Sequence, residues 1–180
     1  DIFIDLGNAP ASNSFLTEKQ LHEPELFMPL KVFVCSSCHL VQTADYKRPD
    51  SIFDETYVYF SSYSKSWLEH ARRYVETMTA RFNLTPASSV VELASNDGYL
   101  LQYFLEKRIP ALGIEPTANT AQVAIDKGIE TIIDFFGIRL ATELAKKGRR
   151  ADLLLGNNVL AHVPDIGDFV GGMKILLKQT

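Results

Sequence analysis

A short polar segment that directly follows an apolar run carries the clearest chemical signal in this chain. The apolar run 90–93 leads into the sequence ASNDG at 94–98, which is typical of a buried strand that enters a tight turn before a helix. Glu115 closes the next apolar run. A strand, a turn and an acidic residue after a second strand are typical, at this spacing, of a nucleoside-binding crevice.

The glycine pattern of this turn narrows the class of ligand. No Gly-x-Gly-x-x-Gly occurs here, so the turn is not built to lie against a pyrophosphate. A nucleoside without phosphates, such as S-adenosylmethionine, therefore fits the segment better than NAD, and a dehydrogenase is disfavoured.

Polar side chains follow four expected strands. Ligands of an open parallel sheet bind beyond the carboxyl ends of the strands, so these side chains should lie near one another. Glycine at 98 lets the backbone approach a ligand, and Asn96 and Asp97 offer contacts to its amino-acid tail. Glu115 would accept hydrogen bonds from both ribose hydroxyls. The full set expected to bind the cofactor is Glu92, Ser95, Asn96, Asp97, Gly98, Glu115, Asp134, Phe135 and Asn157.

The later strand ends have expected roles as well. Asp134 would bind the exocyclic amine of adenine, Phe135 would lie against the ring, and Asn157 would hold the ligand's ammonium group. Plainer structural roles stay open: an ordinary turn for 96–98, a helix start for Glu115, core packing for Phe135 and Phe136, and a loop cap for Asn157 and Asn158.

Alternating strand and helix patterns from about residue 86 would position these side chains. Apolar runs predict strands at 89–93, 111–115, 130–133 and 151–155, and helical periodicity predicts helices at 100–107, 119–126, 137–147 and 166–177. This alternation predicts an α/β fold, with a Rossmann-like sheet of parallel strands and helices on both faces. Four strands leave an open edge, so we expect further strands in a C-terminal part that is missing from this sequence.

The first 85 residues have a different character. Residues 1–60 mix short apolar pieces with prolines, and residues 64–82 carry apolar side chains at helical spacing. We expect a partial zinc-ribbon-like domain at 1–60, a linking and docking helix region at 61–85, and an S-adenosylmethionine-binding domain at 86–180.

Cys35 and Cys38 lie between two short expected strands and have the spacing of one zinc-ribbon knuckle. A structural zinc site needs four ligands, and the sequence contains no second cysteine pair. His22 and His39 are substitutes without convincing spacing, and we expect the second pair to precede Asp1. A redox dithiol and two buried thiols are the competing interpretations.

Composition narrows the classes of function. The 180 residues carry a formal net charge of -4 without a basic block, which argues against extended nucleic-acid binding. No apolar run approaches the roughly 20 residues that span a bilayer. We expect a cytoplasmic protein that binds a small molecule and neither nucleic acid nor membrane.

Together these segments resemble one family, the S-adenosylmethionine-dependent C-methyltransferases that act on nucleotide-linked deoxysugars. The matching segments are DLG at 5–7, CSSCHLVQ at 35–42, YVYFSS at 57–62, VELASNDG at 91–98, LGIEP at 112–116, DFF at 134–136 and NNVLAHVP at 157–164. The resemblance implies an N-terminal domain that binds zinc through four cysteines, a class I methyltransferase domain, and a C-terminal domain that completes the sugar site.

The resemblance also implies a carbon methylation. A base removes a proton from the carbon beside a ketone of the sugar, and the resulting enolate attacks the methyl group of the cofactor. His162, which follows the fourth strand on the ligand side, is the leading candidate. Tyr59 and Tyr57, which the resemblance places beside the sugar, would donate to the enolate oxygen or accept the proton. A methyltransferase for another small acceptor and a non-catalytic binding module are the alternatives.

Overall fold

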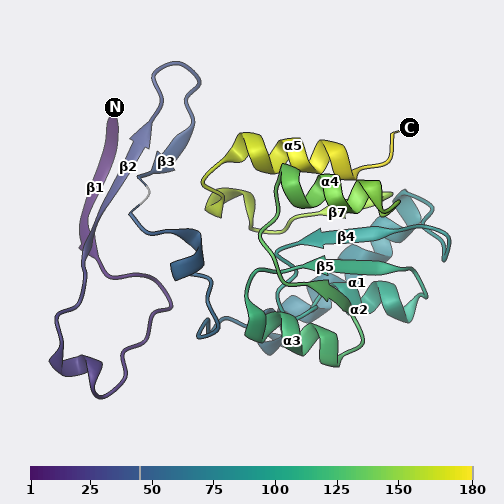
Figure 1. Cartoon of the computed structure of the whole chain (residues 1–180), viewed down its shortest axis with the longest axis horizontal. Helices are drawn as coiled ribbons and strands as arrows, with labels where there is room; N and C mark the ends of the chain where they lie inside the picture. The colour runs from purple at the N-terminus through teal and green to yellow at the C-terminus, as the bar shows by residue number, and fades with distance from the viewer. Residues whose placement is uncertain (45, 180) are drawn as a thin grey trace. The chain divides into compact units, whose positions relative to one another are not determined.

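The computed structural model describes residues 1–44 and 46–179, and the chain divides into two compact units, Asp1–Phe53 and Asp54–Thr180. Each unit is described by itself (Figure 1). Within the described residues, no helix is both long enough and apolar enough to cross a membrane.

The first unit is a three-stranded antiparallel sheet in the order β1-β2-β3. Its strands are β1 (Ile2–Ala9), β2 (Met28–Val34) and β3 (Val41–Thr43). The two short strands predicted around the cysteine pair are β2 and β3, and that prediction is confirmed. None of the described residues in this unit is buried, so its sheet lacks an apolar core of its own. Small domains without a sufficient core are commonly stabilised by a metal, by disulfides or by association with another surface.

The second unit contains a four-stranded sheet in which every pairing is parallel. Its strands are β4 (Val90–Leu93), β5 (Ala111–Ile114), β6 (Glu130–Ile132) and β7 (Leu153–Leu155), in the order β6-β5-β4-β7. All four lie within the ranges predicted from the sequence. The chain runs from β4 outward through β5 to β6 and then returns to the other side of β4. The strand order therefore reverses between β4 and β7, which is where open α/β sheets bind ligands.

Helices cover both faces of this sheet (Figure 1). The helices are α1 (Lys65–Arg81), α2 (Leu101–Glu106), α3 (Ala118–Asp126), α4 (Ile138–Lys146) and α5 (Ile166–Leu176), all close to their predicted ranges. One apolar cluster joins α1, α2 and α3 to the sheet through residues such as Val75, Phe104 and Val90. A second cluster joins α4 and α5 to the other face through Leu140, Phe169 and Val91. The α/β, Rossmann-like fold expected from the sequence is confirmed.

The helix predicted at 64–82 begins one residue later than expected, because Ser64 is its N-cap. The Ser64 hydroxyl accepts a hydrogen bond from the Trp67 backbone N–H at 3.3 Å. Ala71 and Val75 are buried on the face that packs toward α2 and the sheet. This helix therefore belongs to the compact second unit.

Candidate functional site at the carboxyl ends of the parallel strands

The turn after β4 is built from left-handed backbone conformations. Ala94, Asn96 and Gly98 have φ values of 55°, 51° and 74°. A Cβ atom built on Gly98 would lie 2.3 Å from Ile129 Cδ1 and 3.1 Å from Ala124 Cβ. Glycine at 98 is therefore required because the turn packs directly against α3 and the segment before β6. The sequence interpretation had attributed this glycine to close approach of a ligand; the structure gives a packing reason for it.

Glu92 lies on the face of β4 that α1 and α2 cover. Side chains alternate along a strand, and Val90, two residues earlier, belongs to the cluster under α1 and α2. The exposed fraction of Glu92 is 0%. The Asn157 side-chain N–H donates to Glu92 Oε1 at 3.2 Å, while Oε2 finds no hydrogen-bond partner within the part of the chain that the structure describes.

This environment changes the acidity of Glu92. Burial is the main cause that raises the pKa of its carboxyl group, from 4.5 to about 8, and the charges of Glu115 and Asp97 add to the rise. The hydrogen bond from Asn157 and the nearby Tyr99 hydroxyl oppose the rise in the pKa. The Tyr99 hydroxyl makes no well-aligned hydrogen bond to Oε2. Glu92 is therefore largely protonated at neutral pH in the ligand-free chain.

Glu115 follows β5 and is held by backbone amides. Its Oε2 accepts from the Asn96 N–H at 2.8 Å, and its Oε1 accepts from the Thr117 N–H at 2.9 Å. Only 4% of the residue is exposed. These two bonds tie the β4 turn to the start of α3. A carboxylate oxygen can accept more than one hydrogen bond, so the pair of bonds leaves acceptor capacity on both oxygens.

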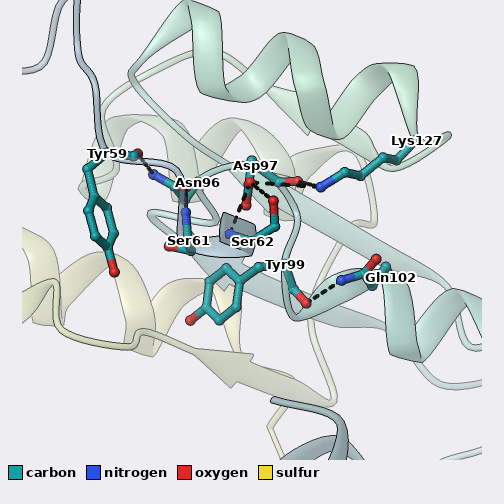
Figure 2. A network of polar contacts seen from close by, with 8 residues as sticks. All are labelled: Tyr59, Ser61, Ser62, Asn96, Asp97, Tyr99, Gln102 and Lys127. Atoms are coloured by element: carbon teal, nitrogen blue, oxygen red, sulfur yellow. Dashed lines mark hydrogen bonds and ion pairs between the residues drawn. The ribbon is translucent and has the colours of Figure 1, made fainter. Parts of the chain in front are cut away.

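A segment before α1 lies across this turn, and its residues 57–62 are here called the strap. The Asn96 side chain binds the strap at two points, because its Oδ1 accepts from the Ser61 N–H at 2.8 Å and its Nδ2 donates to the Tyr59 carbonyl at 3.0 Å (Figure 2). Asp97 Oδ2 accepts from both the backbone N–H and the hydroxyl of Ser62. The polar atoms that the sequence assigned to a ligand's amino-acid tail therefore hold the strap.

The strap carries two tyrosines, Tyr57 and Tyr59, in different environments. Tyr57 is half-buried, and burial, followed by the charge of Glu115 and the proximity of Tyr59, raises the pKa of its phenol. Tyr59 is 52% exposed. Figure 2 shows the Tyr59 and Tyr99 rings below the strap, away from Lys127. The Tyr57 phenol is therefore a hydrogen-bond donor at neutral pH and a poor base.

Asp97 also contacts a basic side chain. Lys127 Nζ donates to the Asp97 carbonyl at 2.7 Å and lies 3.9 Å from Asp97 Oδ2 (Figure 2). The other carboxylate oxygen, Oδ1, has no hydrogen-bond partner among the described residues. Glu92, Asp97 and Glu115 thus form a buried group with more carboxyl groups than cations, and two of its oxygens have no hydrogen-bond partner in the part of the chain that the structure describes.

The side chains that follow β6 lie in different environments. Asp134 forms an ion pair with Arg139, with Oδ2 2.5 Å from the guanidinium, and this contact raises the pKa of the arginine. One oxygen of its carboxylate is therefore engaged by α4, and the contact of Asp134 with an adenine amine stays a prediction. Phe136 packs edge-to-face on Phe169 with centroids 5.4 Å apart, so it is core, whereas Phe135 is 41% exposed.

Two further predicted residues lie at this edge of the sheet in different settings. Ser95 is fully buried, and its Oγ lies against β5, 2.4 Å from where a Cβ on Gly113 would sit. Its hydroxyl therefore fills the space over a glycine. His162 is exposed on the loop after β7, at the end of the 3₁₀ turn Leu160–His162. The structure brings together Glu92, Asn96, Asp97, Glu115 and Asn157, and it places Tyr57 and Tyr59 on the strap that contacts this group.

Sequence reasoning missed several residues of the site. Lys127 contacts Asp97, and the Tyr99 hydroxyl lies near the Glu92 carboxyl group. Asn119 donates to the Tyr57 carbonyl at 2.6 Å. Tyr99 could have been found, because it directly follows the turn at a helix start. Lys127 and Asn119 carry no local signal, since their partners lie 30 and 62 residues away along the chain.

The cysteine pair forms a knuckle in the first unit. Backbone amides of Cys38 and Ser37, followed by the Cys38 thiol, point at the Cys35 sulfur and lower its pKa from 9.0 to about 7. Donors arranged around a sulfur in this way suit a metal-bound thiolate. No group of three or more metal-ligating side chains occurs among the described residues, so the substitution of His22 or His39 for a second cysteine pair is not supported. Cys35 and Cys38 are two of the four ligands that a structural zinc site would need, and their role as metal ligands stays a prediction.

Comparisons with known proteins give matches to a family model and to a curated relative. Residues 1–53 match the model of a family described as "putative zinc binding domain". The chain is 33% identical over 174 residues to the C-methyltransferase NovU of Streptomyces niveus. The alignment covers 97% of this chain and 41% of that protein. The chain therefore spans about two fifths of the length of this relative.

Solved structures of two methyltransferases are similar to the chain at low identity. Magnesium protoporphyrin IX methyltransferase from Synechocystis PCC 6803, solved with bound S-adenosylmethionine, gives a TM-score of 0.49 at 16% identity over 61% of this chain and 54% of that chain. A methyltransferase from Thiobacillus denitrificans, solved with S-adenosylhomocysteine, gives a TM-score of 0.45 at 13% identity. The match covers 59% of this chain and 44% of that chain.

The second unit is a Rossmann-like α/β domain with a polar site at the reversal of its strand order. The zinc-binding family model matches the N-terminal 53 residues, and the similarity to the C-methyltransferase NovU extends along nearly the whole length of the chain.

Proposed function

We propose that this chain is the cofactor-binding part of an S-adenosylmethionine-dependent C-methyltransferase whose acceptor is a nucleotide-linked keto-deoxysugar. The observation that carries the proposal is the buried group formed by Glu92, Asp97 and Glu115 at the ends of β4 and β5. An excess of buried carboxyl groups with unpaired oxygens favours a ligand that brings positive charge and hydrogen-bond donors. S-Adenosylmethionine brings both, through its sulfonium, its ammonium and its ribose hydroxyls.

The roles of individual residues follow from their contacts. Glu115 is fixed by two backbone amides and keeps acceptor capacity for ribose hydroxyls. Asn157 and Glu92 stand at the reversal of strand order, where the amino-acid part of the ligand would lie. Phe135 is exposed after β6 and is available to an adenine ring, and Asp134, paired with Arg139 through Oδ2, would bind the exocyclic amine of the adenine through its other carboxylate oxygen. Ser95 and Gly98 would act through their backbone.

The bound cofactor would supply an electrophilic methyl group. The chain would supply donors and a base for the sugar. The Tyr57 phenol, kept protonated by its surroundings, would donate to the oxygen of the ketone as charge develops on it. His162 would accept the proton from the carbon beside the ketone, that carbon would form a bond to the methyl group, and the bond from methyl to sulfur would break. Tyr59, exposed on the same strap, would contact the sugar.

The first unit would bind zinc. Cys35 and Cys38 would supply two thiolate ligands, and two further ligands would complete the tetrahedral site. A metal there would hold β2 and β3 together in a unit that has no buried residues among those described.

Ligand binding tests the proposal at its first step. Calorimetry with S-adenosylhomocysteine should show binding to the chain with one site, and Glu115→Ala should weaken it by at least about tenfold, in the range expected for a charge-assisted hydrogen bond. The absence of both heat and thermal shift would contradict the cofactor assignment.

Methyl transfer tests the acceptor. Labelled methyl donor with the full-length protein should label nucleotide-linked 4-keto-deoxysugars and should not label matched sugars in which the ketone is reduced. Transfer to an oxygen or nitrogen acceptor instead would establish a different small-molecule methyltransferase, and no transfer with intact cofactor binding would favour a binding module.

A further inference from the structure

The side chain of Asn119, at the start of α3, forms a hydrogen bond with the strap. The reaction proposed above assigns no role to this residue. Asn119 Nδ2 donates to the Tyr57 carbonyl at 2.6 Å. Asn119 Oδ1 accepts from the Thr120 backbone N–H at 2.8 Å. The two halves of one amide are therefore occupied by a helix N–H and by the strap.

The chemistry of these two partners fixes the orientation of the amide. A rotation by 180° about the last side-chain bond would bring Oδ1 against the Tyr57 carbonyl and Nδ2 against the Thr120 N–H. Both contacts would then be repulsive, because each would join two acceptors or two donors. The Thr117 side chain makes no capping bond at this helix start, so Asn119 is the side chain that meets an α3 amide there.

A second amide holds the strap two residues further on. Asn96 accepts from the Ser61 N–H and donates to the Tyr59 carbonyl, which copies the pairing of a neighbouring β-strand. The strap is thus fixed at its beginning by α3 and at its middle by the β4 turn. At the first of these points the Tyr57 phenol is half-buried, and burial, followed by the charge of the nearby Glu115 and the influence of Tyr59, raises its pKa.

We propose that Asn119 is a positioning residue that sets the backbone of Tyr57, and through it the phenol, over the crevice at Glu115. This inference rests on the proposed function for the role of Tyr57, but its structural part stands on the two hydrogen bonds alone. We assign Asn119 no contact with the cofactor or with the substrate. Its loss should therefore move Tyr57 and leave the remainder of the cofactor site in place.

Asn119→Asp separates positioning from folding. The aspartate keeps an acceptor for the Thr120 N–H and places a negative charge in the first turn of α3, where it stabilises the helix. It has no donor for the Tyr57 carbonyl and brings a second acceptor against it. The variant should therefore melt no lower than the wild type and yet release the strap.

Hydrogen exchange of the 55–63 peptide reads the release directly. We expect exchange there to rise by about three- to tenfold in Asn119→Asp, as for the loss of one hydrogen bond, while peptides of β4 and β5 stay unchanged. The matched control is Gln122→Ala on the same helix, because the Gln122 side chain bonds to Asp126 within α3. Asn119→Ser, which keeps a short donor, should give an intermediate rate.

Kinetics of the full-length protein give the second readout. Asn119→Asp should lower kcat by about tenfold or more through misplacement of Tyr57, with a smaller change in KM for the cofactor. Exchange and kcat equal to those of the wild type in Asn119→Asp would overturn the proposal. Faster strap exchange in a wild-type-like fold that binds no S-adenosylhomocysteine would support the clamp and overturn the cofactor assignment instead.

Discussion

Asn157 donates a hydrogen bond to Glu92 Oε1 at 3.2 Å and thereby joins the carboxyl ends of β7 and β4, the two neighbouring strands between which the strand order reverses. The acceptor is a fully buried carboxyl group whose second oxygen is unpaired among the described residues. The bond is made to a group that is protonated at neutral pH, because burial raises the pKa of Glu92 to about 8. The charge state of this one side chain therefore couples the site to pH.

Glu92→Gln should change how stability depends on pH. In the wild type the folded chain holds a proton on Glu92 that the unfolded chain releases above its ordinary pKa of 4.5. The free energy of unfolding should therefore fall as pH rises from about 4.5 to 8, with a slope of up to about 1.4 kcal/mol per pH unit from this group. Glutamine keeps the acceptor for Asn157 without a titration, so urea unfolding at pH 5 to 8 should show a flatter profile.

The stabilising effect of Glu92→Gln over the wild type should grow with pH. At pH 5 the two proteins should be nearly equal, and at pH 8 the variant should be more stable by an amount on the order of a few kcal/mol. Asn157→Ala, which removes the donor and leaves the carboxyl, serves as the comparison. Parallel pH profiles for wild type and Glu92→Gln would show that Glu92 is ionised at neutral pH and would refute this prediction.

Binding of a cationic ligand should release a proton. A positive charge near Glu92 favours the carboxylate, so its pKa falls on binding and part of one proton leaves at pH 7. Calorimetry of S-adenosylmethionine binding in buffers with different ionisation enthalpies should show this proton as a buffer-dependent heat. The buffer dependence should vanish in Glu92→Gln, and its persistence there would assign the proton to another group.

The Cys35 thiol should react as a thiolate near neutral pH in the metal-free chain. Its pKa is lowered to about 7, first by the backbone amide of Cys38, then by that of Ser37 and by the Cys38 thiol. Alkylation of Cys35 by iodoacetamide, followed by peptide mass spectrometry, should reach half its maximal rate near pH 7. In Cys38→Ser the midpoint should rise only slightly, because both backbone amides remain. A midpoint close to 9 would show that the knuckle does not organise these donors.

The strands and helices of the second unit could be predicted because each has a local pattern. Apolar runs and helical periodicity gave β4, β5, β6 and β7, and helices α2 to α5, within a few residues of their observed bounds. The burial of Glu92 was available from the same information. It shares the strand face of Val90, and a period of two places both under the helices.

The partners of the polar turn could not be predicted in the same way. Asn96 and Asp97 bind Ser61 and Ser62, which lie 35 residues earlier in the chain. Nothing in a local pattern tells whether such side chains will meet a ligand or another segment. The ion pair of Asp134 is closer in sequence, since Arg139 is on the first turns of α4, and helix position could have indicated it.

Gly98 shows how a turn can be fixed by packing, and substitution there should be severe. Gly98→Ala places a Cβ 2.3 Å from Ile129 Cδ1 and adds the strain of a positive φ of 74°. Overpacking and left-handed strain together should lower the free energy of unfolding by roughly 2–5 kcal/mol.

Gly128→Ala is the matched control: its φ is 82° but nothing lies within 4 Å of the added atom, so it should cost only the strain, about 1–2 kcal/mol. The double change Gly98→Ala with Ile129→Val removes the closest atom and should recover part of the loss relative to Gly98→Ala alone. Equal destabilisation by Gly98→Ala and Gly128→Ala, measured by urea unfolding, would show that the contact with Ile129 does not hold this turn.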